Sequence, residues 1–200
     1  GLSVMGKVAP DKILRNDRVQ DGDVLILTKP LGVGMVVSAY NAKQTSEAAY
    51  QAAITSMTTL NKYAADIMRE YPVDSCTDIT GFGLAGHLTE MLHGEHQATL
   101  TAENIPMIPE AYECGGEFLT TAGGQRNRDF IGNRIKMTFD DYALEEVLFD
   151  PQTSGGLLIA VQPEYADEMM AKMNELATKP AIIGKVTKKD PTDPVEIIVD

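Results

Sequence analysis

The most informative stretch of the sequence is Cys76 to Leu88, which reads CTDITGFGLAGHL. A carboxylate, Asp78, stands before a run in which Leu84 and Leu88 recur at helical spacing and would share one helix face. Thr80 is a good N-cap, so we predict a helix beginning beside it, with Asp78 just before the helix start. Amides at a helix start favour phosphate, and Mg²⁺ prefers one or two protein carboxylates together with phosphate and water. The stretch therefore suits a metal and phosphate pair.

A purely structural explanation of this stretch stays open. Asp78 could belong to an Asx-turn, and the glycines could serve only to let the helix pack closely against its neighbours. Residue spacing alone favours this explanation over a ligand site.

A second glycine-rich turn, FDPQTSGG, runs from Phe149 to Gly156 and leads into the apolar residues 157–161. Asp-Pro starts a turn, Gly155 and Gly156 permit positive φ, and Thr153 and Ser154 supply hydroxyls, a combination able to cradle an anion. We predict that this turn lies beside the start of the helix that follows Phe82, so that both face one cleft. Tight turns before buried strands are common, so a structural turn is again the simpler interpretation.

Basic side chains and flexible backbone coincide at Gly123 to Arg128, GGQRNR, which we predict to be a loop. Arg126 and Arg128 could meet phosphate in bidentate fashion, or they could pair with surface carboxylates. The sequence does not decide between these two functions. The three histidines have no partners at metal-ligand spacing and are interpreted as structural or solvated.

Composition limits the classes of partner. The chain has 200 residues with 44% hydrophobic content, which is enough for one globular domain over residues 1–200. Its formal net charge of -12 would repel nucleic acid and anionic membranes. No apolar run approaches the roughly 20 residues that a membrane span needs. Cys76 and Cys114 lack CxxC spacing and indicate free thiols in a reducing compartment, so we expect a cytoplasmic protein.

Hydrophobic periodicity predicts short strands alternating with helices. One long helix is expected from Ser46 to Tyr71, and another from Glu164 to Leu176 with Pro163 at its first position. The glycine-rich region from Ile105 to Met137 is predicted to form loops around short helical turns. The expected strands are Leu2 to Val8, Val24 to Thr28, Ala98 to Thr101, Leu157 to Val161, Ala181 to Val186 and Val195 to Val199. This order predicts an α/β or α+β fold with helices layered on a mixed sheet.

Taken together, the motifs resemble the C-terminal domains of selenophosphate synthetases (selenide, water dikinases). The resemblance is carried by CTDITGFGLAGHL and LFDPQTSGGLL, and it extends in the family's order to three further blocks: GLSVMGKVAPDKILRND (1–17), GDVLILTKPLGVG (22–34) and AGGQRN (122–127). It implies an α+β domain of the aminoimidazole ribonucleotide synthetase superfamily. Ala85, Ala122 and Gln125 depart from the usual family pattern, which leaves a substrate role for Gln125 in doubt.

The resemblance also implies a function. Selenophosphate synthetases make selenophosphate, AMP and phosphate from selenide, ATP and water, and the family's equivalent of Asp78 binds Mg²⁺ that bridges the ATP phosphates. The candidate phosphate cradle comprises Thr80, Gly81, Thr153, Ser154, Gly155 and Gly156. The reactive residue and most ATP contacts belong to an N-terminal domain that this sequence lacks. We therefore expect no activity from this chain alone, and the resemblance implies a homodimer at full length.

Two other functions remain as alternatives. Another ATP-dependent enzyme of the same superfamily would need a different substrate pocket, and the DPQTSGG block argues against it. A non-catalytic interaction module of this fold is disfavoured because a carboxylate, Asp78, is retained beside a phosphate-compatible turn.

Overall fold

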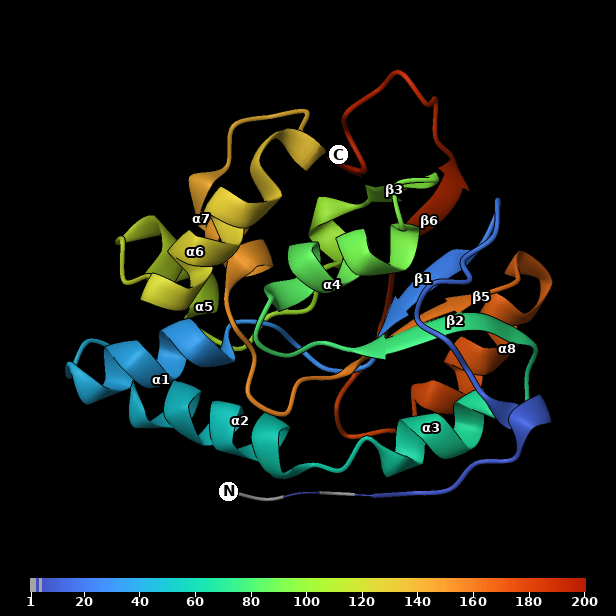
Figure 1. The fold of residues 1–200 in the computed structure, drawn as a ribbon. Helices are drawn as coiled ribbons and strands as arrows, with labels where there is room; N and C mark the ends of the chain where they lie inside the picture. The colour runs from blue at the N-terminus through green and yellow to red at the C-terminus, as the bar shows by residue number, and fades with distance from the viewer. Residues whose placement is uncertain (1–2, 4) are drawn as a thin grey trace.

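Seven strands form one mixed β-sheet in the computed structural model, which describes residue 3 and residues 5–200 (Figure 1). Their order across the sheet is β2-β5-β1-β6-β3-β7-β4. The pairs β3/β7 and β7/β4 are parallel, and the other neighbouring pairs are antiparallel. The strands are β1 (Val24–Leu27), β2 (Val73–Asp78), β3 (His96–Leu100), β4 (Ile135–Met137), β5 (Leu157–Val161), β6 (Ala181–Lys188) and β7 (Ile197–Val199). The predicted α+β class is confirmed.

Side chains of β1 alternate between two apolar cores, one on each face of the sheet. Leu25 and Leu27 enter the larger core, and Ile26 enters the smaller one. The smaller core is closed by α3 (Lys62–Met68) and α8 (Pro163–Met173). The larger core is closed by α1 (Val33–Asn41), α2 (Glu47–Thr58), α4 (Gly83–Leu92), α5 (Ala111–Gly116), α6 (Ala122–Ile131) and α7 (Tyr142–Phe149).

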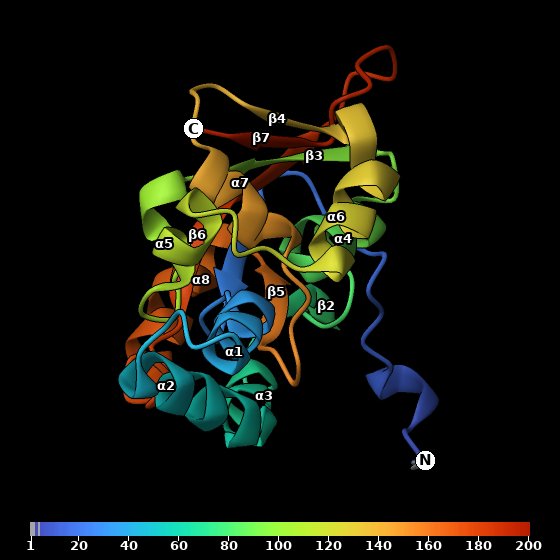
Figure 2. The same ribbon diagram turned by 90° about the vertical axis from the view of Figure 1, so that its left-hand side faces the viewer.

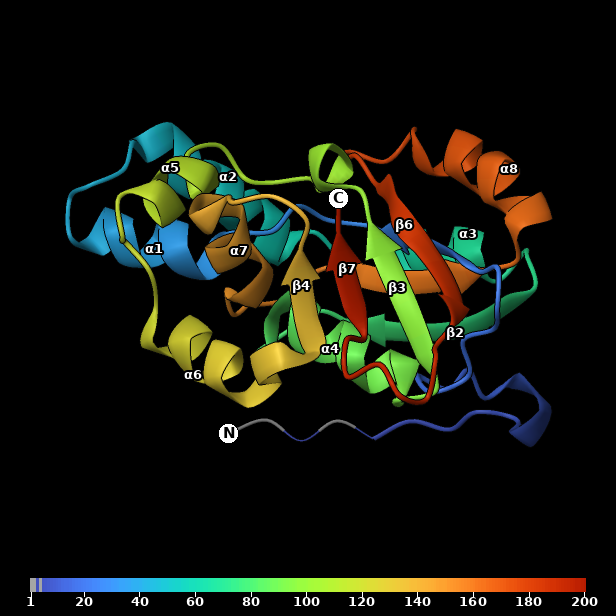
Figure 3. The same cartoon turned by 90° about the horizontal axis from the view of Figure 1, so that it is seen from above.

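The two cores give the domain a layered shape. Figure 2 shows α2 and α3 at one end and β3, β4 and β7 at the other, with α1, α4, α5, α6 and α7 between them. In Figure 3 the strands β4, β7, β3 and β6 lie side by side and face the viewer. Three short 3₁₀ helices complete the elements: η1 (Pro10–Lys12), η2 (Ala102–Asn104) and η3 (Gly132–Arg134). None of the helices in the described residues has the length and apolar character to span a membrane.

Most of the predicted strands are present. The expected segment Leu157 to Val161 is β5, and the segments beginning at Val24, Ala98, Ala181 and Val195 overlap β1, β3, β6 and β7. The strand predicted from Leu2 to Val8 is not formed in residue 3 and residues 5–8, while Leu2 and Val4 lie outside the described residues. Two strands were not predicted, β2 and β4. Each of them lies at an edge of the sheet, where polar side chains are tolerated.

The helix predicted from Ser46 to Tyr71 is wrong as a single element. Ser46 does cap α2, because its hydroxyl accepts a hydrogen bond from the amide of Ala49, but α2 ends where Thr59 turns to an extended conformation. The chain then starts α3 after a short linker. The apolar spacing continues across this break, although the two helices pack in different cores: Ala53 lies in the larger core and Ala64 in the smaller core.

The region from Ile105 to Met137 is more regular than predicted. It contains α5, α6, η3 and β4. In particular, Gly123 to Arg128 lies within α6 and is not a loop. The helix forms despite its two glycines because the Thr121 hydroxyl caps it, accepting a 3.0 Å hydrogen bond from the amide of Gly124.

Candidate functional site

Asp78 is the last residue of the edge strand β2, and its side chain is exposed. It lines a hollow of about 650 Å³ whose other walls are residues 14–16, Cys76, Thr77 and Leu157. A carboxylate with this exposure is free to bind a hard cation without first leaving an internal partner.

Thr80 does not cap the following helix, which corrects the sequence prediction. The helix α4 begins at Gly83, and its N-cap position is occupied by Phe82, which provides no side-chain cap. The reason is a tight turn, since the carbonyl of Thr80 accepts a 3.1 Å hydrogen bond from the amide of Gly83, where φ is +69°. The Thr80 hydroxyl instead lies 3.1 Å from Nε2 of His87. The hydroxyl is therefore held by an imidazole and not by the helix amides.

The glycine turn at residues 153–156 lies directly beside this segment, as predicted. The amide of Ile79 donates to the carbonyl of Gly156 at 2.8 Å, and the amide of Gln152 donates to the carbonyl of Thr80 at 2.9 Å. The contact follows from strand pairing, because β2 and β5 are antiparallel and Asp78 is opposite Leu157. The end of one motif thus meets the start of the other, and the exposed residues Thr153 and Ser154 lie at this junction.

The first half of the DPQTSGG block has a structural task that the sequence did not suggest. Asp150 is 1% exposed, and its Oδ2 accepts a 2.8 Å hydrogen bond from the amide of Gly34. Oε1 of Gln152 accepts a 3.1 Å bond from the amide of Val33. Together these side chains cap the N-terminus of α1, where a negative charge is favourable. The block therefore ties α1 to the site.

Burial makes Asp150 sensitive to pH. Desolvation raises the pKa of its carboxyl to about 7, although hydrogen bonds from neighbours including Gln152 and Gly34 act to lower it. In the unfolded chain the carboxyl should titrate near its ordinary value of about 3.9. Between these two pKa values the folded state holds more protons than the unfolded state.

We therefore expect the contribution of Asp150 to stability to be fully present below about pH 4 and to be lost as the pH rises to about 7. The measurement is urea unfolding at a series of pH values for the wild type and for Asp150→Asn, which cannot ionise. The difference in unfolding free energy between the two proteins should change across this window. An unchanging difference would show that burial of the carboxyl carries no proton-linked cost.

The helix α6 joins the two motifs. Asn127 is 8% exposed, and its Nδ2 donates to the carbonyls of Gly81 and Phe149 at 3.0 and 2.9 Å. Gly123 packs against Pro151 so closely that a Cβ at position 123 would lie 2.5 Å from the proline Cγ. Gly123 therefore serves close packing of α6 against the DPQTSGG block.

The arginines of α6 differ in their surroundings. Arg128 forms ion pairs with Glu145 and Glu146 at 2.7 and 2.5 Å, and its guanidinium lies 4.9 Å from the centre of the Phe149 ring. This confirms the alternative in which Arg128 pairs with carboxylates. Arg126 is exposed.

Neither cysteine is poised for chemistry. Burial, together with the charge of Asp78, raises the pKa of the Cys76 thiol to about 12. Burial and nearby carboxylates raise the pKa of Cys114 to about 11. Since the thiolate is the nucleophilic form, these raised pKa values disfavour a nucleophilic role for either thiol.

The chain is similar to known proteins in family, sequence and fold. The sequence model of the family described as AIR synthase related protein, C-terminal domain, matches residues 20–195. The chain therefore belongs to this family. It is 43% identical over 189 residues to a selenide, water dikinase of Desulfitobacterium hafniense (strain Y51), covering 94% of this chain and 56% of that protein. Identity to the selenide, water dikinase of Agathobacter rectalis is 44%, again over 94% of this chain and 56% of the relative. The chain thus spans just over half the length of these relatives.

Solved structures share the fold at low sequence identity. A thiamine-monophosphate kinase from Stenotrophomonas maltophilia K279a superposes with a TM-score of 0.64 at 17% identity, over 96% of this chain and 54% of that one. A hydrogenase maturation protein HypE in complex with ATP superposes with a TM-score of 0.62 at 16% identity, over 97% and 52%. At this identity the similarity supports the fold alone.

Proposed function

We propose that this chain is the C-terminal domain of a selenide, water dikinase, which makes selenophosphate, AMP and phosphate from selenide, ATP and water. The observation that carries the proposal is the junction of the two motifs. There the exposed Asp78 is paired with Leu157, the residue that directly follows the glycine turn at residues 153–156. The similarity to named dikinases over 94% of the chain supports the same conclusion.

In this proposal Asp78 is a ligand of Mg²⁺ bound with ATP. An exposed carboxylate oxygen suits that ion, which usually takes one or two protein carboxylates and completes its octahedron with phosphate and water. Within the described residues no group of three His, Cys, Asp or Glu side chains could hold a metal ion. Asp78 would therefore share the ion with the ATP phosphates and with carboxylates from the remainder of the enzyme. The cation would neutralise charge on the transferring phosphoryl group.

The phosphate groups would lie between α4 and the glycine turn. The amide of Gly83 at the start of α4 is used by the carbonyl of Thr80, and the helix has no side-chain cap, so the amides that follow Gly83 would face the anion. We assign Thr80 and Gly81 to this side of the cradle and Thr153 to Gly156 to the other side. The hydroxyls of Thr153 and Ser154 and the amides of the two glycines would donate hydrogen bonds to phosphate oxygens.

This chain spans 56% of the length of a named selenide, water dikinase. In the proposal, the N-terminal domain of the full-length enzyme supplies the residue that reacts with selenide and most ATP contacts.

The test is a phosphorus NMR assay of the full-length enzyme with ATP, Mg²⁺ and selenide. We expect selenophosphate, AMP and phosphate to appear together and only when selenide is added, whereas the 200-residue chain alone should form none of them. Thiamine monophosphate and aminoimidazole ribonucleotide precursors serve as competing substrates. Turnover of one of these without selenide would assign the domain to another superfamily enzyme. Selenide-dependent AMP formation by the 200-residue chain would refute the proposal that the N-terminal domain supplies the reactive residue and most ATP contacts.

A further inference from the structure

The ammonium group of Lys29 is buried beneath the glycine turn. Lys29 follows β1, is 2% exposed, and donates to the carbonyls of Ser56, Thr59 and Ser154 at 2.9, 2.7 and 2.8 Å. A lysine ammonium has three hydrogens, so these three acceptors use all of them. Among the described residues it forms no ion pair with a carboxylate. Lys29 therefore has no hydrogen left for a ligand.

Such an arrangement is costly, which indicates a task for it. Removing a charged group from water is unfavourable unless it is paired with an opposite charge as well as hydrogen-bonded, and burial lowers the pKa of Lys29. A second cost lies at Ser154, whose φ of +50° is left-handed, a conformation that is unfavourable for a residue with a Cβ. One hydrogen bond, from Lys29 to the carbonyl of Ser154, joins the buried ammonium to the left-handed residue.

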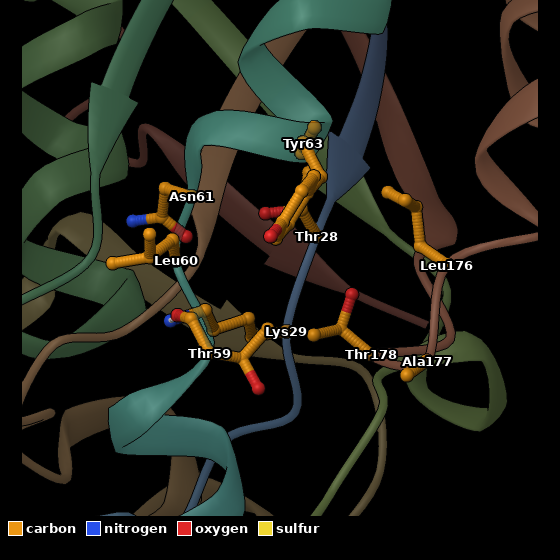
Figure 4. A pocket seen from close by; sticks show the side chains of 10 residues that line it. Thr28, Lys29, Thr59, Leu60, Asn61, Tyr63, Leu176, Ala177 and Thr178 are labelled. Atoms are coloured by element: carbon orange, nitrogen blue, oxygen red, sulfur yellow. Dashed lines mark hydrogen bonds between the residues drawn. The ribbon is translucent and has the colours of Figure 1, made fainter.

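This hydrogen bond is one of three that turn consecutive carbonyls toward the protein. Nδ2 of Asn61 donates to the carbonyl of Gly155 at 2.9 Å, and the amide of Ile79 donates to that of Gly156 at 2.8 Å. Figure 4 shows Lys29 reaching from the segment after β1 toward the linker between α2 and α3, on which Asn61 also stands. In a trans peptide the N–H points opposite to the preceding carbonyl, so the amides of Gly155 and Gly156 are directed away from these donors.

We propose that Lys29 is a positioning residue for phosphate binding. By holding the Ser154 carbonyl, its ammonium keeps Ser154 left-handed and fixes the amides of Gly155 and Gly156 in the direction in which they can donate to an anion. The inference rests on the proposed function, because the anion is the phosphate chain of ATP. Lys29 acts through the turn and touches no substrate atom.

A purely structural role is the competing explanation. The carbonyls of Ser56 and Thr59 lie at the C-terminal end of α2, where a cation is favourable, so Lys29 could serve only to cap that helix. The two explanations differ at Ser154. Glycine adopts a left-handed conformation without cost. In a protein that lacks Lys29, Ser154→Gly should therefore restore the conformation of the turn but not the cap of α2.

The experiment compares three variants of the full-length enzyme: Lys29→Met, Lys29→Met with Ser154→Gly, and Lys29→Met with Ser154→Ala. Both double variants lack the serine hydroxyl, so they differ only in backbone freedom at position 154. Binding of Mg²⁺-ATP is measured by calorimetry, and hydrogen–deuterium exchange is measured on the peptide that contains residues 150–157. If Lys29→Met does not fold, Lys29→Gln, which keeps a donor, replaces it in all three proteins.

We expect Lys29→Met to weaken ATP binding about tenfold, equivalent to about 1.4 kcal/mol, and to speed exchange in the turn. The double variant with glycine should bind ATP more tightly and exchange more slowly in the turn than the one with alanine, because both have lost the Ser154 hydroxyl and differ only in backbone freedom. Equal behaviour of the two double variants would overturn the positioning role and leave the helix cap. If exchange responds and is rescued as expected while ATP affinity never changes, the phosphate cradle of the proposed function is wrong, although Lys29 still controls the turn.

Discussion

Replacement of Asp78 by asparagine in the full-length enzyme should lower the rate of selenophosphate formation by ~10²-fold or more. Asparagine keeps the shape of the side chain but removes the charge that would bind Mg²⁺. Folding should be nearly unaffected because the side chain is exposed at the end of an edge strand. The measurement is kcat and KM for ATP over a range of Mg²⁺ concentrations, where the variant should need more Mg²⁺ for half-maximal rate.

A matched control is Asp129→Asn, which removes an exposed carboxylate from the neighbouring helix α6 and should leave the rate near that of the wild type. Normal selenophosphate production by the Asp78→Asn enzyme would remove the metal role. Asp78 would then serve only as the last residue of β2, before the turn that leads to α4.

Gly155→Ala should lower the free energy of unfolding by ~3 kcal/mol or more, because it overpacks a rigid contact between backbones. A Cβ at position 155 would lie 2.0 Å from the carbonyl oxygen of Ile79, far inside van der Waals contact. Neither segment can yield easily, since the hydrogen bond from Ile79 to Gly156 holds them together. Urea denaturation of the 200-residue chain measures the loss.

Gly81→Ala is the control for this experiment. Gly81 lies in the adjoining segment, but a Cβ there has nothing within 4 Å, and its φ is not in the left-handed region. Its stability should stay within about 0.5 kcal/mol of the wild type. If the two alanine variants were equally stable, the close approach of the two motifs would not be a rigid feature of the domain.

The fold was predictable from sequence where apolar residues determine it. The run from Leu157 to Val161 is buried almost throughout and was predicted with the bounds that β5 has. The strand β2, from Val73 to Asp78, was missed because its polar side chains carry no apolar alternation. The break between α2 and α3 was missed for the opposite reason. An apolar period continued across it, although the two halves face different cores.

The candidate site was predictable only in part. The meeting of the two motifs could be predicted from their chemistry, and antiparallel pairing of β2 with β5 brings it about. The residues that support the site were not predictable, because Lys29, Asp150 and Asn127 bind backbone atoms of distant segments. A backbone carbonyl or amide is offered by nearly every residue, so the identity of the acceptor leaves no signature in the sequence.

The packing of glycines around the DPQTSGG block has an evolutionary consequence. A Cβ at Gly34 would lie 2.5 Å from Oδ1 of Asp150, just as one at Gly123 would strike the ring of Pro151. Homologous positions in such contacts cannot drift independently. A relative with a larger residue in place of Gly123 must also have altered the proline or shifted α6. The two positions should therefore covary among homologues. A designer who transfers the DPQTSGG block to another protein must transfer these glycines with it.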